Sequence, residues 1–557
     1  MKFRLALALA ALASAASLGA RAPDPHAGVP KVAVPQVSVE TLQDVTRFLA
    51  ADELEGRAPG TRGEEKTVAY LIDRFAKAGL EPGNKGSWLQ SVPMVEIDAV
   101  NHTGLRVTGA AEPLHFAFGS DMVSASYRAV DRTEIADAEL VFVGHGIVAP
   151  ELGWNDYAGL DMAGKVAVIL DNDPDYAAPD ETGPFRGRRM TYYGRWTYKF
   201  EEAARQGAAA ALVVHDTFPA GYGWGVVETS WTGPQPHVDR ADQGMSATLA
   251  NGWVQKRVAD ALFRAAGHDP DALIQAARQP GFRPVPLGLK ASMAFDSRIR
   301  RTTSANVIGV LPGRKRKDEA VLYTAHWDHL GRCKPVGTDD ICNGAADNAT
   351  GIAALVALAE ANRRMGPADR SQVFIAFTLE EAGLLGSQFY AQNPVHPLAR
   401  TVGGINFDAI QPGPPARDVM VIGGDKSGLS RYLRAGLARL GLAETPETTP
   451  ERGSYYRSDH FPLARLGVPM LYPKRGTDWV AGGREAGDAA AQDYTDNRYH
   501  KPGDEVTPDW DWSGIHQFVE VSGLVGRSLA MSREWPDWHP DDEFRRVRDE
   551  SRAGQGK

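Results

Sequence analysis

Hydrophobic and polar positions follow helical periodicity near the start of the chain. Residues 39–51 and 64–78 show this pattern, and in the second segment Leu71, Ile72 and Phe75 recur at spacings of three and four residues. A turn-rich stretch with glycine and proline separates the two segments. The pattern predicts two amphipathic helices ahead of the rest of the fold.

The pattern of apolar and polar residues changes twice further along the chain. From about residue 125 short β-rich runs such as Val166–Leu170 and Ala210–Val214 dominate. From about residue 300 short apolar, β-branched runs alternate with helix-patterned segments such as Ile352–Glu360. This alternation predicts an α/β fold with a mixed, mostly parallel central sheet flanked by helices. The later runs are Val307–Leu311, Val321–Ala325, Val373–Thr378, Val402–Phe407, Val419–Ile422 and Pro469–Tyr472.

Composition and charge narrow the class of protein. Of the 557 residues, 43% are hydrophobic and 24% are charged, which is typical of globular proteins and excludes disordered and collagen-like chains. The formal net charge is −9 and no block of like charge occurs. We therefore expect neither nucleic acid nor an anionic membrane surface as a main partner.

The N-terminus has the pattern of an export signal. Lys2 and Arg4 precede a short apolar run from Leu5 to Leu12, and small residues follow up to Ala20. The run is too short to span a bilayer well, which disfavours a retained anchor. We predict a cleaved signal peptide over residues 1–20 and an exported protein, periplasmic or secreted, without a membrane anchor in its mature form.

The two cysteines are Cys333 and Cys342, nine positions apart. In an exported protein such a pair predicts a disulfide. Two free thiols or a metal-binding pair are the alternatives.

Metal-capable side chains follow several of the predicted strands. His326 directly follows the run 321–325, the pair Glu380-Glu381 follows 373–378, and Asp408 follows 402–407. Ligands bind outside the carboxyl ends of strands in open α/β sheets, so we expect these residues to share a site.

Two further residues complete a candidate ligand set. Asp347 lies just before the helix that starts near residue 351, and His460 lies upstream of the run 469–472. Two imidazoles and three carboxylates match the needs of two zinc ions about 3.5–4 Å apart. Glu380 and Glu381 are adjacent, which predicts that one binds metal and the other acts as a general base.

Asp328 lies two residues after His326. At that spacing its carboxylate can turn back and hold the imidazole tautomer as a supporting partner of the ligand. We predict that Asp328 orients His326.

Several segments together resemble a known family. They look like the co-catalytic zinc exopeptidases of the aminopeptidase Y and bacterial leucyl aminopeptidase type, over roughly residues 40–120 and 290–530. The segments are A-H-W-D-H-L-G, N-G-A-A-D-N-A-T-G, T-L-E-E-A-G-L-L-G-S, N-F-D and S-D-H-F-P, with Y-H-K-P-G-D as a closing motif.

The resemblance implies a role for each site residue. One zinc would be bound by His326 and Asp408 and the other by Glu381 and His460, with Asp347 bridging both. Glu380 would be the general base and Asp328 the residue that orients His326. The closing motif that contains His500 would not bind metal.

The β-rich middle resembles a protease-associated domain. The segments on which this resemblance rests are W-N-D-Y-A-G-L-D with G-K-V, and later A-A-R-Q-G-A. We therefore expect a catalytic domain over residues 38–124 and 286–535, an insertion over 125–285, and a charged, frayed C-terminal tail over 536–557. An irregular β-rich insertion of another kind is the alternative.

The resemblance also implies an activity. It predicts a di-zinc metallopeptidase that hydrolyses peptide bonds at the free N-terminus of peptides, with a zinc-activated water as the nucleophile. In some bacterial members a tyrosine directly before the last histidine stabilises the oxyanion. Here Asp459 precedes His460, and Tyr455 and Tyr456 lie nearby, so the oxyanion donor stays open.

Other activities compete with this one. A carboxypeptidase or dipeptidase of the same fold needs a cation for the terminal carboxylate, for which Arg452, Arg457 and Lys474 are candidates. A glutaminyl cyclase with one zinc and a receptor-like binding protein without metal are disfavoured by the complete ligand set. His145, His215 and His329 are interpreted as packing or surface residues.

Overall fold

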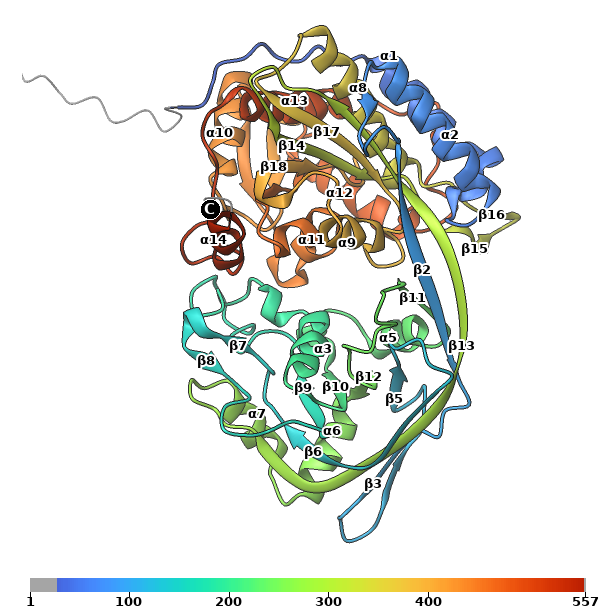
Figure 1. Ribbon diagram of the computed structural model, residues 1–557, viewed down its shortest axis with the longest axis vertical. Coiled ribbons are helices and arrows are strands. Elements are labelled where there is room, and N and C mark those ends of the chain that lie inside the picture. Colours follow the sequence, from blue (N-terminus) through green and yellow to red (C-terminus); the bar gives the residue numbers. More distant parts are fainter. Residues whose placement is uncertain (1–27, 555–557) are drawn as a thin grey trace, which may run out of the picture.

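The computed structural model describes residues 28–554, so the predicted signal peptide lies outside the described residues. The chain forms two lobes stacked along the long axis of the molecule (Figure 1). The upper lobe contains residues 28–88 and 312–554, and the lower lobe contains residues 101–284. Two long strands, β2 (Leu89–Val100) and β13 (Val285–Leu311), run along one side and join the lobes.

The strands of the upper lobe form a mostly parallel sheet. The order is β21-β18-β14-β17-β13, and every pair is parallel except β13 with β17. Alternating residues of β14 face opposite sides: Val321, Tyr323 and Ala325 enter one core, and Leu322 enters the other. The strands besides β13 are β1 (Glu81–Pro82), β14 (Arg316–His326), β17 (Arg370–Phe377), β18 (Thr401–Asn406) and β21 (Met470–Leu471).

Helices cover both faces of this sheet. The most deeply buried is α8, whose small and aliphatic residues on nearly every side pack against the sheet, α1 and α13. The helices are α1 (Val39–Leu49), α2 (Arg62–Lys77), α8 (Thr350–Arg364), α9 (Leu385–Gln392), α10 (Leu429–Leu440), α11 (His460–Arg465), α12 (Gly483–Asn497), α13 (Ser513–Met531) and α14 (Arg545–Ala553). Short helical turns lie at η1 (Asp52–Arg57), η4 (Ala345–Ala349), η5 (Leu398–Arg400), η6 (Pro450–Arg452) and η7 (Ser454–Tyr456).

The lower lobe has its own parallel strands, β6-β9-β10-β12, with β5 antiparallel at the edge. β9 shows the two-residue period: Val166 and Val168 face one core, and Ala167 and Ile169 face the other. The strands are β3 (Leu105–Thr108), β4 (Leu114–Phe116), β5 (Met122–Ala125), β6 (Arg132–Phe142), β9 (Val166–Leu170), β10 (Ala210–His215), β11 (Pro234–Val238) and β12 (Ala250–Gln255). The helices are α3 (Trp196–Arg205), α4 (Thr217–Ala220), α5 (Trp224–Trp231), α6 (Lys256–Ala265) and α7 (Pro270–Ala277), with turns η2 (Pro150–Leu152) and η3 (Tyr192–Gly194).

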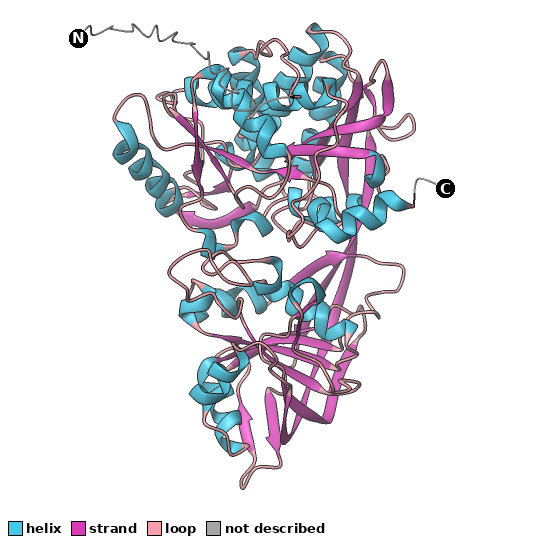
Figure 2. Cartoon of the chain, turned by 90° about the vertical axis from the view of Figure 1, so that its left-hand side faces the viewer, coloured by secondary structure: helices cyan, strands magenta, loops and turns pink. Residues whose placement is uncertain are grey.

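The predicted fold class, a mixed and mostly parallel sheet flanked by helices, is confirmed. That the lower lobe is a protease-associated insertion over residues 125–285 stays a prediction. The lower lobe itself begins earlier in the chain than residue 125. β3 and β5 precede residue 125 in sequence but pair with β13 and β12, so they belong to the lower lobe. Figure 2 shows the long strands crossing from one lobe to the other.

Three small sheets lie outside the main one. The hairpin of β15 (Gly331–Val336) and β16 (Asp339–Cys342) carries the predicted Cys333–Cys342 disulfide, which is confirmed. The others are β7 (Val148–Ala149) with β8 (Trp154–Asn155), and β19 (Asp418–Val421) with β20 (Ala443–Pro446) and β22 (Pro473–Arg475).

The charged C-terminal stretch is not a frayed tail. Trp538 and Phe544 are buried, and the guanidinium of Arg548 donates to the backbone carbonyls of Leu398 and Thr401. The expectation rested on the high charge of the segment, but its few aromatic residues suffice to anchor it. This correction matters because the anchored segment lies at the junction of the lobes.

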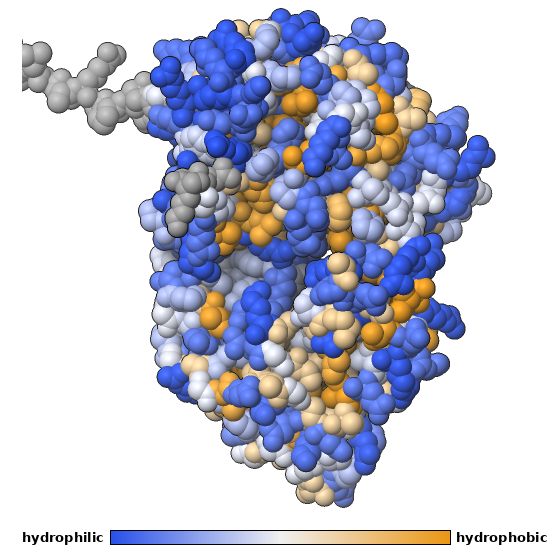
Figure 3. Space-filling view, in the orientation of Figure 1, coloured by the Kyte–Doolittle hydropathy of each residue, from blue (hydrophilic) through white to orange (hydrophobic). Residues whose placement is uncertain are grey.

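The face of the molecule shown in Figure 3 is mainly hydrophilic, and hydrophobic residues form separate groups on it. Within residues 28–554 no helix combines the length and the apolar character needed to cross a membrane.

Candidate metal centre

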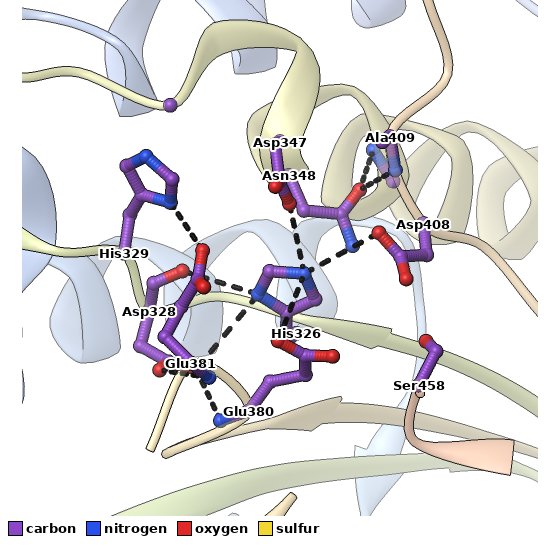
Figure 4. A network of polar contacts seen from close by, with 12 residues as sticks. His326, Asp328, His329, Asp347, Asn348, Glu380, Glu381, Asp408, Ala409 and Ser458 are labelled. Carbon is purple, nitrogen blue, oxygen red and sulfur yellow. Dashed lines mark hydrogen bonds and ion pairs between the residues drawn. The ribbon is translucent and has the colours of Figure 1, made fainter. Parts of the chain in front are cut away.

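Three neighbouring parallel strands bring the predicted residues to one edge of the sheet. β14 ends at His326, β17 is followed within four residues by Glu380 and Glu381, and β18 is followed by Phe407 and Asp408. β14 lies between the other two, so the side chains converge around His326 (Figure 4). Asp347 reaches the same point from η4, at the start of α8.

His326 is at the centre of the group. Its Nε2 lies 3.2 Å from Oδ1 of Asp347, 3.6 Å from Oδ1 of Asp408 and 3.9 Å from Oε2 of Glu380. Its Nδ1 lies 3.2 Å from the backbone carbonyl oxygen of Asp328. A proton on Nδ1 satisfies that carbonyl and leaves the lone pair of Nε2 facing the carboxylates, which is the tautomer that a metal requires.

Asp328 contributes through two different groups. Its backbone carbonyl accepts from His326, while its carboxylate oxygen Oδ1 lies 3.9 Å from the imidazole. The carboxylate instead accepts the backbone N–H groups of Glu380 at 3.2 Å and Glu381 at 3.4 Å. The side chain therefore holds the turn that carries the two glutamates, and the main chain orients the histidine.

A second imidazole in the site comes from His500, not from His460. Nε2 of His500 lies 3.1 Å from Oε2 of Glu381 and 3.5 Å from Oδ2 of Asp347. His329 also enters the group, since its Nδ1 contacts Oε1 of Glu381. Neither residue belongs to the ligand set that the sequence predicts.

His460 lies apart from the carboxylates. Within residues 28–554 no carboxylate oxygen approaches its ring nitrogens within 4.0 Å, and neither nitrogen has a hydrogen-bond partner. The ring is buried between Tyr472 and Tyr455, with centroid distances of 4.4 and 4.5 Å. Burial lowers the pKa of His460 to about 3, so the ring is neutral. The pairing of His460 with Glu381 that the resemblance implied does not match this geometry.

The signal in the sequence that points to His500 is the closing motif Y-H-K-P-G-D itself. Asp504, four residues further on, accepts the backbone N–H groups of Ala346 and Asp347, both at 3.0 Å. The closing motif is therefore fastened to the loop that carries Asp347, although no predicted strand or helix pointed there.

The electrostatics of the group call for a cation. Burial raises the pKa of Glu380 well above its usual range, with the charges of Asp408 and Glu381 adding to the effect and His326 opposing it. Burial also disfavours the ionised form of Asp347, but its contacts with His326 and His500 outweigh this and hold its pKa well below normal. Burial opposes protonation of His500, but its contacts with Asp347 and Glu381 outweigh this and raise its pKa to about 10. Without metal, protons on the imidazoles balance the crowded carboxylates.

The donor set fits divalent zinc. Imidazole nitrogens and carboxylate oxygens within 4.8 Å of one another occur in three overlapping groups. Nε2 of both His326 and His329 is buried without a hydrogen-bond partner. The groups are His326 with Asp347 and Asp408, His326 with Glu380 and Glu381, and His329 with Asp347 and Glu381.

Asp408 is held from outside the group. The hydroxyl of Tyr472 donates to its Oδ2 at 2.9 Å, and Nζ of Lys474 donates to its backbone carbonyl. Tyr472 thus holds one carboxylate oxygen while Oδ1 lies toward His326, and Lys474 holds the backbone of the same residue.

A parallel α/β sheet with imidazoles and carboxylates gathered at its carboxyl edge defines a metal-binding α/β protein. Residues 306–524, which contain all of these side chains, match the model of Peptidase family M28. The chain is thus similar to this family over these residues, which confirms the resemblance to zinc exopeptidases at the level of the family.

Individual relatives are similar over shorter stretches. The mouse protein described as Aminopeptidase NAALADL1 is 30% identical over 141 residues, which cover 23% of this chain and 17% of the relative. Aminopeptidase YwaD of Bacillus subtilis is 28% identical over 172 residues, which cover 30% of this chain and 34% of the relative. The chain thus matches 17% and 34% of the length of these two relatives.

Solved structures resemble the chain over most of its length. An aminopeptidase from Aneurinibacillus sp. strain AM-1 has 21% sequence identity and a TM-score of 0.47, covering 90% of this chain and 96% of its own. BSAP, a zinc aminopeptidase from Bacillus subtilis, has 18% identity and a TM-score of 0.41, covering 92% and 100%.

Proposed function

We propose that the protein is a zinc-dependent aminopeptidase with two metal ions per chain. The observation that carries this proposal is the position of the Asp347 carboxylate. It lies between two imidazoles, with Oδ1 3.2 Å from His326 and Oδ2 3.5 Å from His500. A carboxylate that offers one oxygen to each side is suited to bridge two ions.

Each ion has its own set of ligands in this proposal. His326, Asp408 and Asp347 would hold the first ion. His500, Glu381 and Asp347 would hold the second, and His500 would take the place that the resemblance gave to His460. His329 orients Glu381 by contact with its other oxygen, Oε1.

Glu380 acts as the general base. Its carboxylate lies 3.9 Å from His326 and its side chain is only 11% exposed, while the carboxylate of Glu381 contacts His500 and His329 instead. When bound, zinc polarises the scissile carbonyl and lowers the pKa of water toward ~7. Glu380 accepts the proton of the attacking water and passes it to the leaving amine.

Tyr499 supplies the oxyanion donor. The sequence analysis looked for a tyrosine directly before the last histidine of the site. With His500 in that position the tyrosine is Tyr499, whose ring stacks on His500 with centroids 3.9 Å apart. The residue is 43% exposed, and a phenolic O–H beside the site can donate to a developing oxyanion.

The choice of the amino end rests on the relatives and on charge. The curated relatives above are described as aminopeptidases, and the carboxylates of the site suit a free α-amino group. A carboxypeptidase would need a free cation, but Lys474 is engaged by the Asp408 carbonyl. Arg457 is exposed and keeps that alternative testable.

The experiment uses aminoacyl and N-blocked peptide substrates, with chelator, without it, and after zinc is added back. We expect cleavage of unblocked amino termini alone, loss of activity with chelator and recovery with zinc. Cleavage of N-blocked peptides from their carboxyl end would favour the carboxypeptidase. Zinc analysis should find about two ions per chain, whereas one ion would favour a cyclase-like centre.

We also propose that the protein is exported through the predicted signal peptide. N-terminal sequencing of the protein from the periplasm and from the medium tests this. A mature N-terminus near residue 20 supports the proposal, and an intact N-terminus in the cytosol contradicts it.

A further inference from the structure

Arg57 is a fully buried arginine behind the metal centre. It ends η1, between the two N-terminal helices, and none of its surface is exposed. Its guanidinium donates only to backbone carbonyls: Nε to Trp327 at 2.9 Å, Nη2 to Gly344 at 3.0 Å, and Nη1 to Leu49 and Asn343. The planar group therefore ties three separate segments of the chain together.

Two of those segments carry the candidate ligands. Trp327 directly follows His326, and Gly344 lies three residues before Asp347. One rigid guanidinium thus holds the backbone of the His326 loop and that of the Asp347 loop. A lysine ammonium cannot span the same carbonyls, since it lacks the planar fork of donors.

The positive charge of Arg57 also interacts with the carboxylates of the site. No carboxylate in residues 28–554 forms an ion pair with it, yet Asp328, Asp504, Asp347 and Glu381 all attract it. Burial lowers its pKa to about 10, so the guanidinium is charged at neutral pH. A buried cation without a bonded carboxylate is costly, and here the acidic cluster offsets that cost.

The backbone around Arg57 is held in an unusual shape. Glu55, Gly56 and Arg57 have φ values of 47°, 68° and 54°, all in the left-handed region. At Gly56 a Cβ would lie 2.5 Å from the carbonyl oxygen of Cys342 and 2.6 Å from that of Gly331. Non-glycine residues persist in this region where their surroundings demand it, and such positions cluster at functional sites.

We propose that Arg57 is a positioning residue that holds the loops of His326 and Asp347 in the metal-binding arrangement before metal arrives. The inference rests on the proposed zinc centre. It assigns a role in that centre to the N-terminal segment, which lies outside the stretch of the chain that matches the peptidase family.

The first test compares Arg57→Lys with Arg370→Lys. Arg370 is a suitable control because it is also fully buried and donates to backbone carbonyls, those of Leu529 and Glu534, far along the chain from the ligands. Zinc affinity, the visible spectrum of the cobalt-substituted protein and thermal stability are measured for both variants.

We expect Arg57→Lys to weaken zinc binding about 10–100-fold, as supporting partners of metal ligands do, and to change the cobalt spectrum. At saturating zinc, kcat should fall while KM stays near normal. Arg370→Lys should lower stability but leave zinc affinity and spectrum as in the wild type. If Arg57→Lys only loses stability as the control does, the proposal is overturned.

A second test needs no variant and so does not depend on folding of Arg57→Lys. Hydrogen exchange of the full chain is followed with and without zinc, in peptides that cover residues 326–329 and 343–348. Similar protection in both forms supports the preorganisation of the two loops that the role of Arg57 requires, and protection only with zinc contradicts it. A wild type that binds no zinc would refute the proposed function itself, whereas two bound ions with an unaffected variant refute only the role of Arg57.

Discussion

Three imidazoles surround the carboxylates of Asp347 and Glu381, and each has a different neighbour. His326 contacts Asp347 from the end of β14, His500 contacts both carboxylates from the loop after α12, and His329 contacts only Glu381. The central sheet positions His326, whereas His500 reaches the site through contacts between segments far apart in sequence. Substitutions of single side chains can therefore tell which residue binds metal and which one moves a proton.

Glu380→Gln should lower kcat by about 10²–10⁴-fold, because the amide cannot accept the proton of the attacking water. The amide has nearly the same shape, so zinc content and thermal stability should match the wild type. Steady-state kinetics and metal analysis check this. A variant with near-normal kcat would remove Glu380 from the role of general base.

His500→Ala should bind about one zinc per chain, because the second ion loses its imidazole. His460→Phe is the matched control, since it keeps a ring between Tyr455 and Tyr472 and should bind two. Metal analysis of the purified variants decides between them. The reverse result, with one zinc lost only in His460→Phe, would restore the ligand set implied by the resemblance.

Elements far apart in sequence are connected by a few extended or buried segments. β13 pairs with β6 through its first half and with β17 through its last five residues, so a single strand belongs to both lobes. The C-terminal segment is also a connector, since Trp538 and Phe544 join an aromatic cluster with Tyr192 and Tyr198 of the lower lobe. Its buried aromatic residues should therefore contribute to the stability of the whole protein.

Trp538→Ala should destabilise the protein by about 3–5 kcal/mol, because it removes a large buried side chain and leaves a cavity. The indole N–H also donates to the Gly467 carbonyl at 2.9 Å. Arg546→Ala, at an exposed position on α14, should change stability by less than about 0.5 kcal/mol. Denaturant unfolding measures both, and similar effects would mean that the segment is not anchored by its aromatic residues.

The whole molecule keeps its lower lobe against the metal-binding edge of the upper lobe. Ion pairs cross the junction between Arg188 and Glu451 at 2.7 Å and between Arg465 and Glu201. On the other side β11 of the lower lobe pairs with β2. Such a junction restrains the lobes from separating, and its buried groups make it sensitive to pH.

Acid should weaken this junction through His237 on β11. Burial lowers its pKa to about 4 from the ordinary value of 6.5, and its Nε2 has no hydrogen-bond partner. Between pH 6.5 and 4 the unfolded chain binds a proton that the folded chain does not, so stability falls as pH falls through that window. The loss at pH 5 relative to pH 7 should be on the order of 1–2 kcal/mol.

His237→Phe tests this, since a phenyl ring keeps the packing against Tyr127 but cannot titrate. Its free energy of unfolding should depend less on pH between 7 and 5 than that of the wild type. Equal pH dependence in both proteins would exclude His237 as a source of acid sensitivity.

Much of this protein can be read from local pattern. Alternating apolar runs and helices determine an α/β sheet, and parallel strands share their carboxyl edge, so His326, Glu380, Glu381 and Asp408 had to meet. The disulfide follows from two cysteines nine positions apart in one hairpin.

Tertiary structure decided the rest, because it depends on contacts between segments that local pattern does not connect. His500 and Arg57 reach the metal centre from loops held by backbone hydrogen bonds rather than by periodic packing. Trp538 and Phe544 find their core only on the other lobe. Residue types and spacings thus specify which chemistry is available, while the folded chain selects the imidazole that completes it.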